Sequence, residues 1–241
     1  MPRIVAIIQA RMSSERLPGK VLMDLAGEPM LAHVVRRAQA TKALSEVVVA
    51  TAEATADDVI AALCRGEGWQ CFRGSEADVL DRYYICAKQH GAEQIVRITA
   101  DNPLTCPEQA ARAIEHHLIT RAEYTHMEGL PLGTAVEVIE AGALERAWRE
   151  GIQPHHREHV TPYLYEVSGR CRAEKPAAPR ELAHPEMRLT VDVAEDLDLM
   201  RRIYAALYEP GRLVRLPDVV DLLRTRPELL AINRHVEQRS R

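Results

Sequence analysis

Three cations stand close together near the start of the chain, within the residues ARMSSERLPGK at positions 10–20. Arg11, Arg16 and Lys20 supply positive charge, and the serine hydroxyls and backbone amides between them can donate hydrogen bonds to phosphate oxygens. Cations held in such a loop can stabilise the charge that develops when a phosphoryl group is transferred. A basic loop can also be ordinary solvated surface, which is the more common case for an arbitrary cluster of Arg and Lys.

Two aspartates supply the opposite charge, and each comes after an apolar run that predicts a strand. Asp101 follows IVRIT, and Asp192 follows RLTV. Two carboxylates at the carboxyl ends of strands, opposite a triphosphate, suit one or two Mg²⁺ ions. The alternative is structural, with Asp101 capping a turn and Asp192 capping the helix that begins near Glu195.

The elements that must position these residues follow from the pattern of apolar residues, in which short β-branched runs alternate with helical stripes. This alternation predicts an α/β fold with a mostly parallel sheet, whose ligands bind beyond the carboxyl ends of the strands. A single domain is the default for 241 residues. We expect strands at 4–8, 47–50, 95–98, 135–139 and 187–192, helices at 29–40, 107–119, 141–150 and 195–207, a capped helix start at Thr55 and Asp58, a connecting loop at 175–185, and a frayed end at 234–241.

Composition excludes several classes of protein. The formal net charge is -4, which gives no electrostatic footprint for nucleic acid and no polybasic patch for a membrane. The five cysteines form no CxxC pair, so we expect free thiols in a reducing cytosol. The apolar run at 4–8 is too short for a membrane span or a secretory signal, and we expect a cytoplasmic protein.

The loop at 10–20 is neither of the two common phosphate-binding motifs, because the sequence has no GxxxxGK followed by Ser or Thr and no GxGxxG. The segment IIQARMSSERLPGKVLMDLAGEPML at 7–31 instead resembles the opening signature of the cytidylyltransferases that activate acidic sugars. The resemblance is greatest to the spore-coat polysaccharide cytidylyltransferases, which are related to the acylneuraminate and 3-deoxy-manno-octulosonate cytidylyltransferases. Further similar stretches are RGSEADVLDRYY at 73–84, RITADNPL at 97–104, GTAVEVI at 133–139, HREHVTPYLY at 156–165 and RLTVDVAEDLDL at 188–199.

This resemblance implies a three-layer α/β/α nucleotidyltransferase fold and the transfer of CMP from CTP to a small acceptor, with Mg²⁺ as cofactor. It also implies a homodimer, with 129–165 as the acceptor and dimer-contact region. Arg11, Lys20 and Asp101 become candidate catalytic residues, and Asp101 and Asp192 candidate metal ligands. The candidate nucleotide-binding residues are Ala10, Arg11, Met12, Ser13, Ser14, Arg16, Lys20, Arg73, Ser75, Thr99 and Ala100.

The segment at 73–84 also has an ordinary structural interpretation. Arg73 and Ser75 follow a short predicted strand, and the resemblance implies that they help to close the nucleotide site. Asp78 could equally be a helix N-cap, and Arg82 could form an ion pair on the helix surface.

The acceptor side is less defined by the sequence. Glu137 stands inside the apolar strand AVEVI, and the resemblance places it in the acceptor pocket with His156 and His159. Alternatively, the histidines at 155, 156 and 159 are solvated residues at the start of a helix. A third option is that they bind zinc, but their spacing is not HExxH and no fourth ligand is evident nearby. The cation that would hold an acidic acceptor stays open among Arg97, Arg157, His156 and Arg188.

Three functional hypotheses compete at this point. The first is attack by an acceptor oxygen, from a sugar hydroxyl, a phosphate or a phosphonate, on the α-phosphorus of CTP with release of pyrophosphate. The second is a nucleotidyltransferase that uses another nucleoside triphosphate on a sugar phosphate, and the third is a non-catalytic nucleotide-binding protein. A histidine-based metallohydrolase is a further, weaker alternative.

Overall fold

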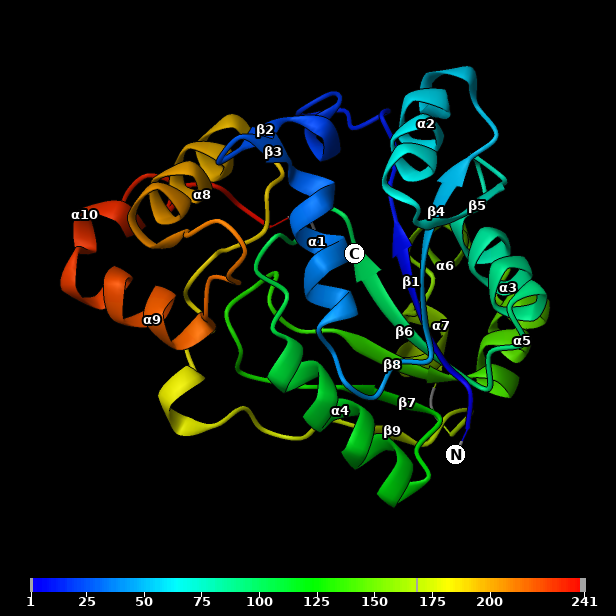
Figure 1. Ribbon diagram of the computed structural model, residues 1–241. Coiled ribbons are helices and arrows are strands. Elements are labelled where there is room, and N and C mark those ends of the chain that lie inside the picture. Colours follow the sequence, from blue (N-terminus) through cyan, green and yellow to red (C-terminus); the bar gives the residue numbers. More distant parts are fainter. Residues whose placement is uncertain (1, 168, 239–241) are drawn as a thin grey trace.

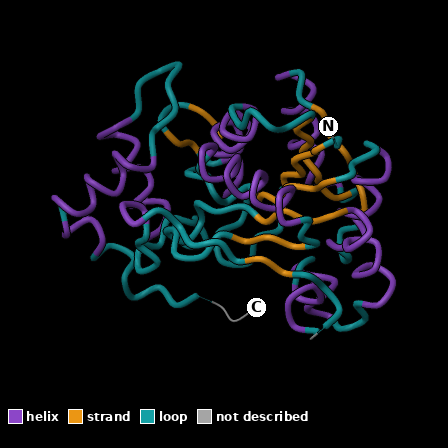
Figure 2. The backbone as a smooth tube through the Cα atoms, turned by 90° about the horizontal axis from the view of Figure 1, so that it is seen from below, coloured by secondary structure: helices purple, strands orange, loops and turns teal. Residues whose placement is uncertain are grey.

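Strand β1 (Ile4–Gln9) is buried because its side chains alternate between two hydrophobic clusters. Ile4, Ala6 and Ile8 belong to one cluster, and Val5 and Ile7 belong to the other. A strand of this kind lies inside a sheet that has helices on both sides. The computed structural model describes residues 2–167 and 169–238 and has this three-layer arrangement (Figures 1 and 2).

The described part of the chain forms a seven-stranded sheet in the order β5-β4-β1-β6-β8-β7-β9, and a separate small hairpin of β2 and β3. Strands β5, β4, β1 and β6 are mutually parallel, so their carboxyl ends meet at one edge of the sheet, whereas β8 runs antiparallel to β6 and β7. The further strands are β2 (Asp24–Leu25), β3 (Glu28–Pro29), β4 (Glu46–Ala52), β5 (Gln70–Gly74), β6 (Gln94–Thr99), β7 (Tyr124–His126), β8 (Glu137–Glu140) and β9 (Ala173–Glu174).

Helices cover both faces of the sheet. The first cluster contains residues of α1, α2, α4, α8 and α9, and the second contains residues of α3, α5 and α7. The helices are α1 (Met30–Gln39), α2 (Asp58–Glu67), α3 (Val79–Gln89), α4 (Pro107–Thr120), α5 (Ala141–Glu150), α6 (Pro154–His159), α7 (Pro162–Glu166), α8 (Ala194–Leu207), α9 (Leu216–Thr225) and α10 (Pro227–Leu230).

Most expected elements are confirmed, but two expectations are wrong. The helix α2 begins at Asp58 after a 3-10 turn at Thr55–Asp57, and no side chain caps it. The strand expected at 187–192 is also wrong. This segment forms an isolated bridge between Leu132 and Arg188 and is otherwise bonded to loops. The Leu189 amide donates to the Leu132 carbonyl at 2.8 Å, and the Val191 amide donates to the Asp101 carbonyl at 2.9 Å. An apolar run therefore signalled burial here, but no neighbouring strand was available to build a ladder.

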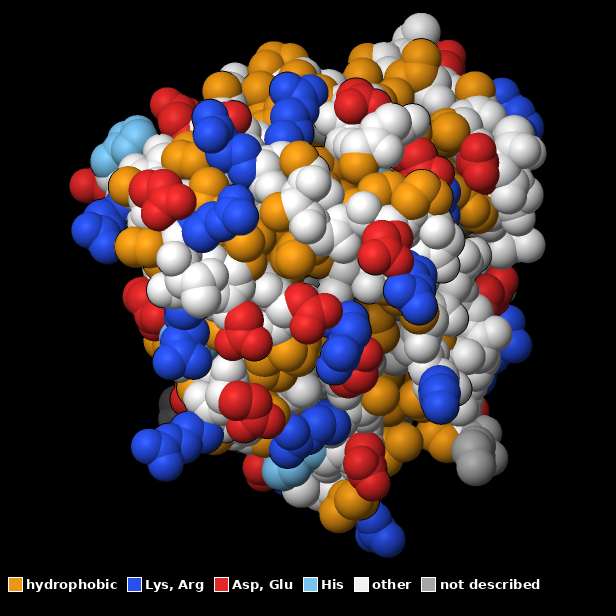
Figure 3. All heavy atoms as spheres, turned by 60° about the vertical axis from the view of Figure 1, so that its left-hand side comes forward, with side chains coloured by type: hydrophobic (Ala, Val, Ile, Leu, Met, Phe, Trp, Pro, Cys, Tyr) orange, Lys and Arg blue, Asp and Glu red, His pale blue; other side chains and the backbone are white. Residues whose placement is uncertain are grey.

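Three other expectations concern the surface charge, the cysteines and membrane-spanning helices. Charged side chains of both signs are interspersed over the face seen in Figure 3, as the balanced composition predicts. The five cysteines are free thiols. None of the helices among the described residues has both the length and the apolar character that a membrane-spanning segment needs.

The expected frayed end at 234–241 is described only at 234–238, which form no helix or strand and are mostly exposed. Gln238 accepts a hydrogen bond from Arg188, and Asn233 just before this segment is buried and donates to the Arg188 carbonyl at 3.0 Å. Residues 239–241 lie outside the described residues. The exposed segment at 234–238 therefore keeps a contact with Arg188 at its end.

Gly133 allows the loop before β8 to approach the segment at 187–192. A Cβ atom at Gly133 would lie 2.7 Å from the Thr190 backbone nitrogen, while one at Gly129 would meet nothing closer than 3.7 Å. The φ angles are 92° and 88°, so alanine is similarly strained at both positions and only the clash differs. We expect Gly133→Ala to lower the free energy of unfolding by about 1–3 kcal/mol more than Gly129→Ala, measured by urea denaturation. Equal losses would show that the backbone can move apart there.

Candidate active site

The loop at 10–20 is closed by its own backbone. The Met12 carbonyl accepts hydrogen bonds from the Ser14 amide at 2.9 Å and the Gly19 amide at 3.0 Å. Gly19 has a φ angle of 72°, a left-handed conformation that favours glycine. This closure leads directly into the single 3-10 turn Lys20–Leu22, which brings Lys20 back toward the sheet.

Asp57 anchors this loop, and the sequence analysis missed it. Its side chain is buried and accepts hydrogen bonds from the Met12 amide at 2.8 Å, from the Thr51 hydroxyl at 2.9 Å and from the Ala52 amide at 3.0 Å. The loop after β1 is therefore tied to the end of β4. Asp57 stands beside the expected helix start at Thr55 and Asp58, but a capping pattern does not reveal a contact with position 12.

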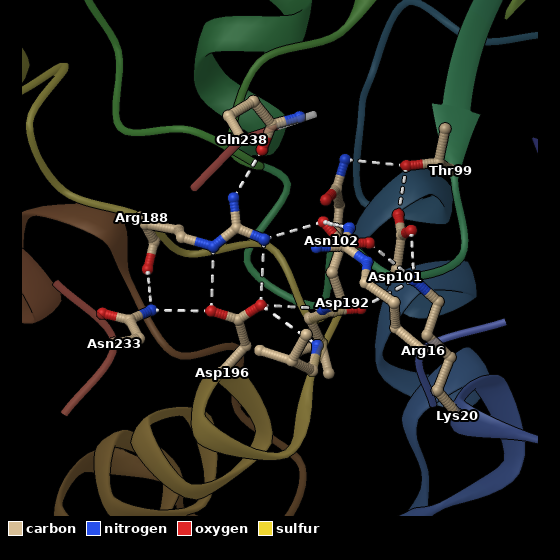
Figure 4. Close-up of polar contacts among 12 residues, drawn as sticks. Arg16, Lys20, Thr99, Asp101, Asn102, Arg188, Asp192, Asp196, Asn233 and Gln238 are labelled. Atoms are coloured by element: carbon tan, nitrogen blue, oxygen red, sulfur yellow. Dashed lines mark hydrogen bonds and ion pairs between the residues drawn. The ribbon is translucent and has the colours of Figure 1, made fainter. Parts of the chain in front are cut away.

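The ammonium of Lys20 joins three segments that are far apart in the sequence (Figure 4). Its Nζ atom donates to Asp101 Oδ2 at 2.7 Å, to the Val191 carbonyl at 2.8 Å and to Asp192 Oδ1 at 2.9 Å. Arg16 Nη2 lies 3.2 Å from the second oxygen of Asp192. The structure thus brings the two candidate metal ligands and two of the loop cations into one cluster.

Electrostatics in this cluster favours the ionised groups. Burial opposes the charged form of Lys20, but the nearby carboxylates of Asp101 and Asp192 raise its pKa above the usual value. Burial likewise disfavours ionised Asp192, while Lys20, Arg16 and Arg188 hold the pKa of Asp192 below its usual range. Charge pairing outweighs desolvation for both groups.

A second network of hydrogen bonds, formed by Arg188 and Asp196, holds Asp192 in place (Figure 4). Arg188 donates to Asp192 at 2.8 Å and to the buried carboxylate of Asp196 at 2.9 and 3.0 Å. Asp196 also accepts from the Asp192 amide at 2.9 Å and from Asn233 at 2.9 Å. Asp196, not Asp192, therefore satisfies amides at the start of α8, so the capping interpretation of Asp192 is wrong.

Asp101 lies at the turn that follows β6. Its Oδ1 atom accepts a hydrogen bond from the Thr99 hydroxyl, and its Oδ2 atom accepts from Lys20. The turn itself is held by the Asn102 amide, which donates to the Thr99 carbonyl at 3.2 Å. The carboxylate of Asp101 is thus directed at Lys20 by contacts on both of its oxygens.

Two adjoining clefts open at this edge of the sheet. The first, which we call the loop cleft, has a volume of about 170 Å³. The second, which we call the strand cleft, has a volume of about 770 Å³ and extends along β6 and β8. Arg16, Thr99, Asp101 and Glu158 line both, so the clefts share a wall.

The structure brings many of the sequence-predicted residues to these clefts and leaves others elsewhere. The loop cleft is lined by Arg11, Ser14, Arg16, Lys20, Thr99, Ala100 and Asp101, and a small adjoining pocket by Ala10, Arg11 and His159. The strand cleft is lined by Glu137 and His159 among others. The linings of these clefts include none of Met12, Ser13, Arg73, Ser75 and His156, nor the candidate metal ligand Asp192.

Arg73 and its neighbours have structural contacts. Arg73 donates to the Ala52 and Ala54 carbonyls and pairs with Asp58 at 2.6 Å, which holds the connection between β4 and α2. Asp78 is the N-cap of α3, as its structural interpretation predicts. The expected surface ion pair of Arg82 is wrong, because this side chain is buried and donates to the Ser75 carbonyl at 2.8 Å.

The floor of the strand cleft holds a buried ion pair. Arg97 on β6 pairs with Glu137 on β8, and Glu137 also accepts hydrogen bonds from Tyr124 at 2.6 Å and Thr161 at 2.9 Å. Of the four candidates for holding an acidic acceptor, Arg97 lines this cleft. Arg157 instead pairs with Asp78, and Arg188 with Asp192 and Asp196.

The strand cleft is also lined by three residues that were not predicted as site residues, namely Glu158, His126 and Gln238. Glu158 stands inside the quoted stretch HREHVTPYLY, so the signal was present although the residue was not chosen. His126 and Gln238 carry no local pattern, because tertiary folding alone brings β7 and the carboxyl-terminal segment to the cleft.

The lowered pKa of Asp192 predicts how stability changes with pH. The stabilisation from its ionised form is present above the pKa of the unfolded chain, near 4, and is lost as the pH falls through the lower folded pKa. We expect Asp192→Asn to lower the free energy of unfolding by about 2 kcal/mol at pH 7 and by much less at pH 3. Urea denaturation at both values checks this.

The matched control is Asp198→Asn, which removes an exposed pair with Arg202 on α8. Such exposed pairs contribute little, so this variant should follow the wild type at both pH values. An Asp192→Asn deficit that is equally large at pH 3 and pH 7 would contradict the electrostatic origin of the effect.

The described geometry agrees with three comparisons with known proteins. The family model described as Cytidylyltransferase matches residues 5–215. An uncharacterized protein of Methanocaldococcus jannaschii is 36 % identical over 240 residues, which cover 99 % of this chain and 97 % of that protein. The spore coat polysaccharide biosynthesis protein SpsF of Bacillus subtilis is 34 % identical over 233 residues, which cover 95 % and 97 %.

Solved structures give the same picture. A cytidylyltransferase from Leptospira borgpetersenii superposes over 100 % of both chains with a TM-score of 0.88 and 25 % identity. A CMP:2-keto-3-deoxy-manno-octonic acid synthetase complexed with CTP, 18 % identical, shares the fold with a TM-score of 0.65 over 85 % of this chain and 99 % of its own. The chain therefore belongs to the cytidylyltransferase family and has its nucleotidyltransferase fold.

Proposed function

We propose that the protein transfers CMP from CTP to a small acidic acceptor, such as an acidic sugar or a compound bearing phosphate or phosphonate, and releases pyrophosphate. The observation that carries this proposal is the position of Lys20, which lines the loop cleft and bonds to Asp101 and Asp192. The loop cleft thus contains cations for a triphosphate and the carboxylate of Asp101, and Lys20 connects it to Asp192, which does not line the cleft. The relatives named for CMP transfer and for polysaccharide biosynthesis support the reaction class.

The donor would bind in the loop cleft. Arg11, Arg16 and Lys20 line it, and Ser14 adds a hydroxyl. These groups would hold the triphosphate and stabilise charge as pyrophosphate leaves. Asp57 occupies the Met12 amide, and the Met12 carbonyl accepts from Ser14 and Gly19, so the backbone atoms of Met12 are already bonded and would not read the base.

The oxygens around Lys20 fit a magnesium ion. Asp101 Oδ2, the Val191 carbonyl and Asp192 Oδ1 all lie within 2.9 Å of the Lys20 ammonium, and Mg²⁺ prefers such hard oxygen ligands. A bound Mg²⁺ would neutralise charge on the triphosphate. The same oxygens cannot hold the ammonium and the metal together, so metal binding would release Lys20 toward the phosphates in the loop cleft.

The acceptor would bind in the strand cleft. Arg97 and His126 offer cationic or hydrogen-bonding groups for an acidic substituent, and His159 and Glu158 lie where the two clefts meet. Glu137 contributes by fixing Arg97. We leave His156 out of this proposal because its described contacts are with Glu166 and Tyr163.

The reaction is a displacement in which the acceptor oxygen forms a new bond to the α-phosphorus of CTP. The bond from this phosphorus to the bridging oxygen of pyrophosphate breaks, and pyrophosphate leaves with the electron pair. The residues of the two clefts would act mainly by holding both reactants in line. A homodimer through 129–165 stays a prediction, although exposed Ile152 and Tyr165 provide apolar surface there.

A screen for pyrophosphate release tests the proposed reaction. With Mg²⁺ and a panel of acidic sugars, sugar phosphates and small phosphonates, we expect release from CTP rather than from ATP, GTP or UTP. Lys20→Ala should lower turnover at least about 100-fold without changing the circular dichroism spectrum, because it removes a cation from the reacting phosphates. Lys42→Ala is the matched control, since Lys42 is exposed on a loop away from the clefts.

Two results would overturn the assignment. Preference for another nucleotide would favour a different nucleotidyltransferase. CTP binding without turnover on any acceptor class would favour a non-catalytic nucleotide-binding protein.

Metal dependence can be tested through binding as well as activity. Chelation of divalent metal should stop pyrophosphate release, and Asp101→Asn should weaken the binding of Mn²⁺ measured by calorimetry. Lys20→Gln should strengthen Mn²⁺ binding to the nucleotide-free protein severalfold, because the ammonium no longer competes for the carboxylates. Unchanged Mn²⁺ affinity in both variants would place the metal elsewhere.

A further inference from the structure

The histidines at 155–159 point in two directions. His159 lines the strand cleft, whereas His155 and His156 on α6 face Glu166 on α7. His155 Nε2 lies 2.8 Å from Glu166 Oε2, and His156 Nε2 lies 3.5 Å from the same oxygen. One ligand atom from each of the three residues falls within 4.8 Å of the others. The proposed transfer reaction does not use this group.

The two distances to Glu166 are close to the ligand separations of a zinc site. With bonds of about 2.0–2.1 Å to nitrogen and 2.0–2.2 Å to oxygen, two ligands of a tetrahedral zinc ion lie roughly 3.3 Å apart. His155 and Glu166 are partly exposed, at 40 % and 39 % of their side chains, so both can adjust by small rotations. Two imidazoles and one carboxylate suit Zn²⁺ rather than Mg²⁺, which prefers oxygen ligands alone.

His156 gives an independent indication that a ligand belongs here. The residue is 7 % exposed, and its Nδ1 atom has no hydrogen-bond partner among the described residues. Its Nε2 atom has the loose 3.5 Å contact with Glu166, and its ring is held edge-on by Tyr163 at 5.8 Å. Burying Nε2 with only this loose contact is unfavourable, and coordination of a metal by Nε2 would offset that cost, although it would leave Nδ1 without a partner.

We propose that His155, His156 and Glu166 bind a zinc ion, with water as the fourth ligand. The ion joins α6 to α7, two short helices that also meet where the ring of His156 packs edge-on against Tyr163. Because α6 also carries Glu158 and His159 into the clefts, the ion stabilises the helix that forms the shared wall. This role is structural and does not depend on the proposed transfer reaction.

Zinc titration of the metal-free full chain tests the site. We expect one zinc ion per chain by calorimetry in buffer that contains excess Mg²⁺, which is added to compete with zinc for the carboxylates around Lys20. His155→Gln and Glu166→Gln should each weaken zinc binding at least tenfold and abolish the rise in melting temperature that zinc causes in the wild type. His156 is left intact in these variants because it is buried.

The matched control is His116→Gln. His116 Nε2 lies 3.3 Å from Glu174 Oε2, so this variant removes a similar histidine and glutamate contact that lacks a second histidine. It should bind zinc as the wild type does. Equal zinc affinity in wild type, His155→Gln and Glu166→Gln would overturn the proposal, as would loss of zinc binding in Asp101→Asn instead. Anomalous scattering at the zinc edge should place the ion between α6 and α7.

Discussion

The interaction on which the rest of the site depends is the contact of one ammonium with two carboxylates. Asp101 and Asp192 lie close enough to share Lys20, and without a cation between them their charges would repel each other in a partly buried place. Lys20 resolves this repulsion and also ties the loop after β1 to the turn after β6 and to the segment before α8. The same arrangement supplies oxygen ligands for a metal when the lysine leaves.

Two buried aspartates keep this arrangement in place. Asp57 holds the backbone of the loop at 10–20, and Asp196 holds both Arg188 and the amide of Asp192. Neither lines the loop cleft or the strand cleft. Their carboxylates accept hydrogen bonds from backbone amides, from the side chains of Thr51 and Asn233 and from the Arg188 guanidinium, so each buried carboxylate is satisfied. Rigid support of this kind is what allows catalysis by positioning.

The antiparallel pairing of β6 with β8 supplies the second side of the strand cleft. A parallel neighbour would carry its first residues to the far edge of the sheet, but antiparallel β8 begins at the active edge and places Glu137 opposite Arg97. The histidines of α6 also lie on different sides of this region. His159 lines the strand cleft, while His155 and His156 face Glu166. A cluster that looks uniform in the sequence is therefore divided between two surroundings.

The sequence by itself determined the class of fold, the buried strands and the loop that bears the cations, because these depend on local periodicity and on residue types within short windows. It also identified Asp101 and Asp192, since acids that follow apolar runs are visible locally. It misjudged the segment at 187–192 and the cap of α8, and it missed Asp57 and Asp196 as supports. Only the tertiary structure decided these points, because Lys20 and Asp192 meet across 172 positions and hydrogen bonding between distant segments leaves no local pattern.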